Sequence, residues 1–138
     1  MSKNDEQILA NELARLGGSV LTNGVATFLP TDTYEISFQM ATQSTAVMGV
    51  AATILKTEGE LLSTEEIPPL FEVKGMVGAG FLDMNPALVN ISITVLSPLR
   101  AHVRIQGKAK EGLIKQHAGK KATQRVAHLL LSQLREMN

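Results

Sequence analysis

The last third of the chain, residues 90–138, constrains the fold most, because its hydrophobic period changes once, from two residues to about 3.6. Apolar and polar side chains alternate through residues 89–95 and again through residues 101–106. The following run, which ends in RVAHLLLSQLREMN, repeats its apolar residues at helical spacing. The alternation predicts two half-buried strands and the run predicts a long amphipathic helix. We therefore expect a sheet with one apolar face under the terminal helix and one wet face.

The earlier residues add elements of the same kinds. Alternation over residues 34–40 predicts a strand, and apolar spacing after residue 42 predicts a helix that Thr42 or Ser44 caps and Gly59 ends. Residues 61–64 and 71–77 are typical of two further strands, separated by the proline turn EEIPPL. Consecutive strands with short links pair antiparallel. The sequence thus predicts an α+β fold, with an antiparallel sheet of four to five strands, two helices packed on one face and a short N-terminal helix.

The chain divides at about residue 30. Residues 5–16 have helical spacing, and the pair Asn23-Gly24 lies between two apolar stretches, which favours a hairpin turn. We expect residues 1–30 to form this helix and hairpin, as an ordered part of the domain or as a detachable arm. At 138 residues there is room for a single core, so residues 31–138 are expected to form one α+β domain.

A resemblance rests on three stretches. They are YEISFQMATQSTAVMGVAATILKTEG, LFEVKGMVGAGFLDMNPALVNISITV and RAHVRIQGKAKEGLIKQHAGKKATQRV. Their layout resembles small bacterial α+β domains of unknown function, built as strand, helix, several antiparallel strands and helix, and is similar to half of the TATA-box-binding-protein saddle. The resemblance covers about three quarters of the chain and brings no site residues. DNA binding does not follow from it.

Several functions lack their residues. The chain has no cysteine, so thiolate metal sites and cysteine nucleophiles are excluded. His117 and His128, eleven residues apart on one helix, are separated by roughly 16 Å, which is too far to share a metal. GMVGAG has the wrong glycine order for a dinucleotide loop and predicts a bulge or bend in the sheet. No catalytic set stands out, so we expect neither an enzyme nor a cofactor.

No signal peptide and no apolar run of membrane-spanning length is visible, so we expect a cytoplasmic protein without a membrane span. Charge is nevertheless segregated. Residues 1–97 carry four basic and eleven acidic residues, 4 − 11 = −7, and residues 98–138 carry nine basic and two acidic residues, 9 − 2 = +7. Either the basic end folds back on the acidic end, or a basic face meets an anionic partner or another subunit.

Two sets of residues are candidate binding sites. The basic set predicts a surface for an anion, such as a nucleic-acid backbone, an acidic lipid or an acidic protein. It comprises His102, Arg104, Lys108, Lys110, Lys115, Lys120 and Lys121. The leucine set exceeds one inward stripe, so either a wide stripe is buried within the chain or one side is left for self-association. It comprises Leu9, Leu13, Leu16, Leu131 and Leu134.

The leading hypothesis is a non-enzymatic interaction module that self-associates or binds another protein. Two alternatives stay open. One is a small apolar-ligand carrier, in which the sheet wraps the terminal helix as in helix-grip folds and methionines line the cavity. Those methionines would be Met40, Met48, Met76 and Met84. The other is an anion or nucleic-acid binder; nucleic acid is the less favoured partner, because aromatic residues are missing from the open sheet face.

Overall fold

The computed structural model describes residues 5, 8, 31–78, 86–110 and 117–137. Its elements follow in the order β1 (Thr31–Met40), α3 (Ser44–Glu58), β2 (Gly59–Ile67), β3 (Leu70–Val77), β4 (Ala87–Ser97), β5 (Arg100–Lys110) and α4 (Ala118–Met137). The predicted fold class is confirmed, with five antiparallel strands and two helices. Residues 5 and 8 are helical. The rest of the predicted N-terminal helix and the hairpin at residues 23 and 24 lie outside the described residues.

The sheet has the strand order β1-β5-β4-β3-β2, so the first strand pairs with the last. The strands β2 to β5 follow one another as hairpins, and every neighbouring pair is antiparallel. One row of apolar residues crosses four strands, from Ile36 through Ile105 and Ile91 to Val73. Because β-branched side chains pack well on a pleated surface, this row builds the centre of the core.

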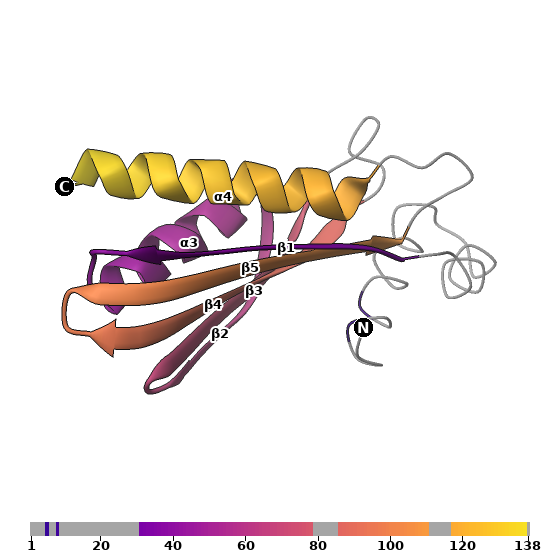
Figure 1. Cartoon of the computed structure of the whole chain (residues 1–138). Helices are drawn as coiled ribbons and strands as arrows, with labels where there is room; N and C mark the ends of the chain where they lie inside the picture. Colours follow the sequence, from indigo (N-terminus) through magenta and orange to yellow (C-terminus); the bar gives the residue numbers. More distant parts are fainter. Residues whose placement is uncertain (1–4, 6–7, 9–30, 79–85, 111–116, 138) are drawn as a thin grey trace.

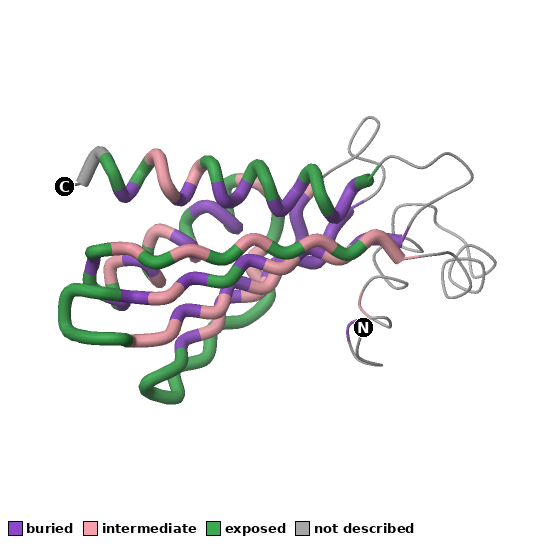
Figure 2. The backbone as a smooth tube through the Cα atoms, in the orientation of Figure 1, coloured by how far each residue is buried: buried purple, intermediate pink, exposed green. Residues whose placement is uncertain are grey.

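Both helices cover the same face of the sheet. Figure 1 shows α4 lying lengthwise along β1 and β5, with α3 beside it over the other strands. Val103 and Ile105 have no exposed surface, whereas Arg104 between them is exposed. Figure 2 shows buried stretches alternating with less buried ones along the strands. The prediction of one apolar, helix-covered face and one wet face is therefore confirmed.

Small residues bring the first turn of α4 close to the sheet. A Cβ atom on Gly107 of β5 would lie 2.6 Å from the carbonyl oxygen of Gly119 and would also collide with Thr123 Oγ1. A Cβ on Gly119 would in turn strike the carbonyl oxygen of Asp32. The Thr123 hydroxyl is buried and donates to the Gly119 carbonyl at 2.7 Å. Gly107 therefore sets the distance between α4 and β5, and Gly119 sets the distance between α4 and β1, since any side chain there would push the helix away.

Helix α3 differs from the prediction at its start and agrees at its end. Gln43, and not Thr42 or Ser44, occupies the N-cap, and no side chain bonds the free backbone groups there. Ser44 instead turns its hydroxyl into the protein, where it has no partner among the described residues. Gly59 follows the last turn as expected, and its N–H donates to the Leu55 carbonyl. The predicted cap was wrong by one residue in either direction, because Ser44 is already the first helical residue and Thr42 precedes the N-cap.

Strand β2 is longer than the predicted residues 61–64 and contains a register shift between Leu61 and Ser63. The glycine motif was expected to supply such a bulge. Its first member, Gly75, pairs with Leu61, where this shift begins, so the extra residue lies opposite the motif, in β2 and not in β3. A Cβ on Gly75 would approach the Glu60 carbonyl oxygen to 2.7 Å and Leu55 to 3.2 Å. Gly75 is needed for close packing of α3 against the sheet, while Gly80 lies outside the described residues.

Candidate functional site

The space between helices and sheet is filled by side chains. A side chain that lined a cavity large enough for water would keep some accessible surface. Most of the buried residues that form this core keep 1% or less of their accessible surface. They include Val47, Ala51, Ile54, Leu55, Val73, Ile91, Ile93, Val103, Ile105, Val126, Leu130 and Leu134. Within the described residues, this part of the interior is therefore a packed core.

The methionines expected to line a cavity do not gather there. Met40 and Met48 lie at the margin of the core and are half-buried. Met76 belongs to a separate small cluster with Leu88 and Ile8. This cluster sits on the opposite face, because Met76 and Leu88 alternate with the inward residues of β3 and β4. Met84 lies outside the described residues.

The wet face carries ion pairs between the two oppositely charged parts of the chain. Arg104 Nε donates to Glu35 Oε1 at 2.7 Å across β5 and β1. Lys108 Nζ donates to Asp5 Oδ2 at 2.9 Å, and Arg125 on the helix layer pairs with Glu58 of α3. Each pair joins a base of residues 98–138 to an acid of residues 1–97. For these three pairs, the basic end of the chain folds back on its acidic part, as the first interpretation of the charge pattern expects.

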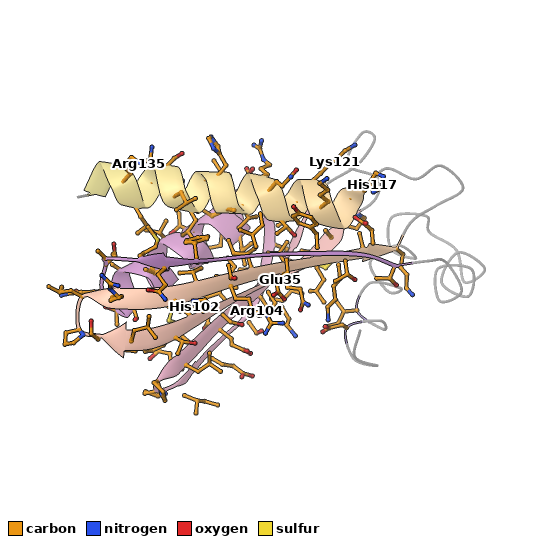
Figure 3. All side chains as sticks on the ribbon, viewed as in Figure 1. Glu35, His102, Arg104, His117, Lys121 and Arg135 are labelled. Atoms are coloured by element: carbon orange, nitrogen blue, oxygen red, sulfur yellow. The ribbon has the colours of Figure 1, made fainter. Side chains whose placement is uncertain are left out.

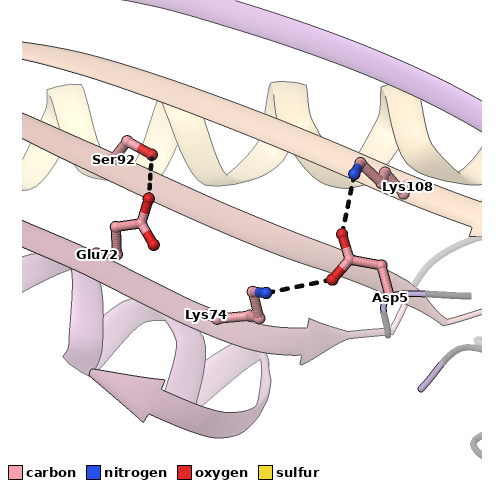
Figure 4. A network of polar contacts seen from close by, with 5 residues as sticks. All are labelled: Asp5, Glu72, Lys74, Ser92 and Lys108. Atoms are coloured by element: carbon pink, nitrogen blue, oxygen red, sulfur yellow. Dashed lines mark hydrogen bonds and ion pairs between the residues drawn. The ribbon is translucent and has the colours of Figure 1, made fainter. Parts of the chain in front are cut away.

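Asp5 binds two lysines at once on the wet face. Its Oδ1 accepts a hydrogen bond from Lys74 Nζ at 3.2 Å, while Oδ2 accepts the bond from Lys108 (Figure 4). Burial raises the pKa of Asp5, but the bonds from Lys108 and Lys74 outweigh that effect and hold the pKa below its ordinary value. Asp5 is therefore ionised at neutral pH, and its two hydrogen bonds hold it over β3 and β5.

Figure 3 shows that the predicted basic set is divided between the two layers. His102, Arg104 and Lys108 are on the wet face of β5, whereas Lys121 projects from the far side of α4. Lys120 also belongs to α4, and its ammonium group lies 5.5 Å from the centre of the Tyr34 ring. The buried Lys110, only 2% exposed, is not part of a surface, and Lys115 lies outside the described residues. The structure does not bring these residues together on one face.

The predicted leucine set is also divided. Leu131 is half-buried on α4, and Leu134 is fully buried in the core beneath it. Leu134 is thus already covered within the chain and is not a surface residue. Leu9, Leu13 and Leu16 lie outside the described residues.

Among the described residues, four of the five exposed large apolar side chains lie at two turns, and the fifth, Leu62, lies in β2 at the register shift. Ile67 and Leu70 flank the turn between β2 and β3. Leu96 lies near the end of β4, and Leu99 lies in the turn between β4 and β5. Ile67 is 68% exposed and Leu99 is 64% exposed, which is unusual for side chains of this size. We call these four residues the hairpin tips. The Val95 N–H donates to the Pro69 carbonyl at 2.9 Å and joins the turn between β2 and β3 to the neighbouring strand β4.

The hairpin tips lie at the end of the sheet where α4 also ends (Figures 1 and 2). They are continuous with the margin of the core, because Val95, Ala101 and Met40 form the last row across β4, β5 and β1. The sequence contained a signal for them. IPPL and LSPL share an apolar residue at each end of a proline turn, where polar residues are usual. This surface was missed because each stretch was interpreted only as a turn.

The described residues offer no group of three or more histidine, aspartate or glutamate side chains that could hold a metal ion. Over the same part of the chain, neither helix combines the length and the apolar character needed to cross a membrane. The four side chains of the hairpin tips are all aliphatic.

The fold and this surface define a class: an α+β protein in which a long C-terminal helix lies lengthwise on an antiparallel sheet, with exposed apolar side chains at the hairpin end. No family model and no curated protein matches the chain. Several solved structures are similar to it. A START superfamily protein from Mycobacterium smegmatis is 7% identical with a TM-score of 0.47, over 77% of this chain and 99% of that one.

Two further structures are similar in the same way. A norcoclaurine synthase from Thalictrum flavum is 10% identical with a TM-score of 0.36, covering 76% of this chain and 97% of that one. The ZhuI aromatase/cyclase from Streptomyces is 12% identical with a TM-score of 0.31, covering 78% and 86%. Similarities this low say nothing about ligand or reaction. None of the three is a TATA-box-binding protein, and the resemblance to half of that saddle stays a prediction.

Proposed function

We propose that this protein is a non-enzymatic interaction module that binds its partner through the hairpin tips. The supporting observation is the exposure of Ile67, Leu70, Leu96 and Leu99 at one end of the sheet. Burying such side chains in a complex removes apolar surface from water, at roughly 25 cal/mol per Å². An isolated exposed leucine needs no explanation, but several on adjacent turns are typical of a contact surface.

The surface is also well ordered for binding. The two turns are short and contain Pro68, Pro69 and Pro98, and the bond from Val95 to Pro69 fixes the first of them to β4. Proline restricts the backbone before binding, so little conformational entropy remains to be lost in the complex. A rigid apolar end of this kind favours recognition of a partner over catalysis, which needs polar groups.

Site-specific photo-crosslinking tests the proposal. A photoreactive amino acid replaces Leu99 in the full-length chain in cells, and a matched variant carries it at Gln124, an exposed position on α4. We expect a discrete adduct from position 99 and none from position 124. Ile67→Asp in the same chain is expected to abolish the adduct, because it places a charge in the apolar contact.

Each outcome bears on the proposal. A position-99 adduct that Ile67→Asp removes supports it, whether the captured molecule is a second copy or another protein. Equal labelling from positions 99 and 124, or an adduct that is unaffected by Ile67→Asp, would contradict it. Circular dichroism of each variant checks that the fold is retained.

A second candidate, an apolar-ligand carrier, is favoured by one observation. Phe38, Met40, Met48 and Leu129 are apolar but only half-buried, and they pack around the margin of the core. The glycines fix only the first turn of α4 to the sheet. Separation of the C-terminal half of α4 from β1 would thus open the core at this margin, and a ligand would replace the lost contacts.

Methyl NMR with a long-chain fatty acid as the probe tests the carrier. The Met40 and Met48 methyl signals are expected to shift on titration, and the Met76 signal is the internal control because it lies on the opposite face. Shifts at Met40 and Met48 alone would support carriage. Unchanged spectra, or equal shifts at Met76, would argue against it.

A further inference from the structure

We infer that the partner of the hairpin tips is a second copy of this chain, bound end to end about a twofold axis. The inference rests on the proposed function and names its partner. It is carried by the opposite charges of the two hairpins, by the absence of ion pairs at their ends and by the distance that separates them within one chain.

The two hairpins carry opposite charge. Residues 59–77, which form β2 and β3, contain four glutamates and one lysine, 1 − 4 = −3. Residues 87–110, which form β4 and β5, contain two arginines, two lysines and no acid, giving +4 with histidine neutral. The apolar tip of one hairpin is thus bordered by Glu65 and Glu66, and that of the other by Arg100.

These bordering charges are not neutralised within the chain. In the part of the chain that the structure describes, Glu65, Glu66 and Arg100 take part in no ion pair, in contrast to Glu35 and Arg104. Strand β2 is separated from β5 by β3 and β4. Three strand spacings amount to about 14 Å, which is too far for a direct ion pair.

A second copy would cover the apolar side chains of both tips and would pair the charges beside both of them. A twofold axis that passes between the turns, perpendicular to the line joining them, places the acidic hairpin of each copy against the basic hairpin of the other. Ile67, Leu70, Leu96 and Leu99 of each copy then meet at the centre, with the ion pairs around them. In a twofold dimer every contact occurs twice, so Glu65 and Glu66 of one copy meet Arg100 of the other at two equivalent positions.

Pairing through the open edge of β2 is the competing arrangement of two copies. That edge carries Glu60, Glu65 and Glu66 and is interrupted by the register shift near Leu61. Two such edges would place like charges opposite one another, and bulges hinder strand addition. The charges therefore favour contact between unlike hairpins over contact between like edges.

Charge reversal with mixing tests the inference by analytical ultracentrifugation of the full chain. The wild type is expected to form dimers. Arg100→Glu alone, and Glu65→Lys with Glu66→Lys, are each expected to weaken the dimer by about ten-fold or more, because like charges then meet twice. An equimolar mixture of the two variants restores opposite charges at both positions and is expected to dimerise.

Recovery in the mixture cannot arise from misfolded chains, so it separates the interface from a folding defect. Lys121→Glu, on the far side of α4, is the matched control and is expected to leave the dimer unchanged. A wild type that stays monomeric, or variants whose mixture stays monomeric, would overturn the inference. Discrete crosslinking from position 99 to a different protein would also overturn it while still supporting the proposed function.

Discussion

Arg104 of β5 donates a hydrogen bond from Nε to Glu35 Oε1 on β1, and this 2.7 Å contact joins the basic end of the chain to its acidic part. The first and last strands are neighbours in the sheet, although 69 residues separate the two side chains. Together with the pairs of Asp5 with Lys108 and Glu58 with Arg125, it shows that part of the segregated charge is paired inside the molecule.

The Glu35–Arg104 pair is expected to contribute little stability. The two side chains are 43% and 50% exposed, so water screens their attraction. A double-mutant cycle with Glu35→Gln and Arg104→Met, followed by urea denaturation, should give a coupling free energy of about 0.2–1 kcal/mol. A coupling several times larger would show that the pair is better shielded than its exposure indicates.

Gly107 should be intolerant of even a methyl group. Gly107→Ala forces α4 away from β5, because the Gly119 carbonyl oxygen is backbone and cannot move aside. We expect a loss of about 1–3 kcal/mol in the free energy of unfolding. Gly49→Ala is the control, since nothing lies within 4 Å of a Cβ at this exposed position of α3. It should raise stability by about 0.5–1 kcal/mol, and equal effects of both changes would contradict the packing described here.

Protonation of Asp5 should release its contact with Lys74 and Lys108. Its folded pKa is depressed, so the stabilisation is fully present above the ordinary value of 3.8 and is lost as pH falls through the lower, folded pKa. The carboxyl ¹³C shift of Asp5 is expected to titrate with a midpoint below 3.8, and Lys108→Met should raise that midpoint. A midpoint at or above 3.8 in the wild type would show that burial, and not the lysines, dominates.

Neighbouring leucines of α4 should differ in their importance for stability. Leu130 is fully buried, so Leu130→Ala leaves a cavity and is expected to lower the free energy of unfolding by about 2–5 kcal/mol. Leu131 is only half-buried, and Leu131→Ala should have a clearly smaller effect. Thermal and urea unfolding of the two variants measure the difference, and equal losses would contradict the orientation of α4.

Local pattern alone determined much of this protein. The alternation around Val103 and Ile105 and the helical spacing through Leu130 predicted the strands, the terminal helix and the face each buries, because side-chain direction repeats with the period of the backbone. The residues at which helices and strands begin and end were less well predicted by the local pattern. Thr42 and Ser44 have the chemistry of a cap, yet both are buried, and burial depends on the whole chain.

Only the tertiary structure decided what lies at the surface and what pairs with what. The pairing of β1 with β5 brings Glu35 to Arg104 and the first turn of α4 to Gly107, and neither contact is local in sequence. The same fold covers Leu134 within the chain and leaves Ile67 and Leu99 in water. The sequence identifies the apolar side chains. Which of them remain exposed to solvent depends on where segments distant in the sequence pack.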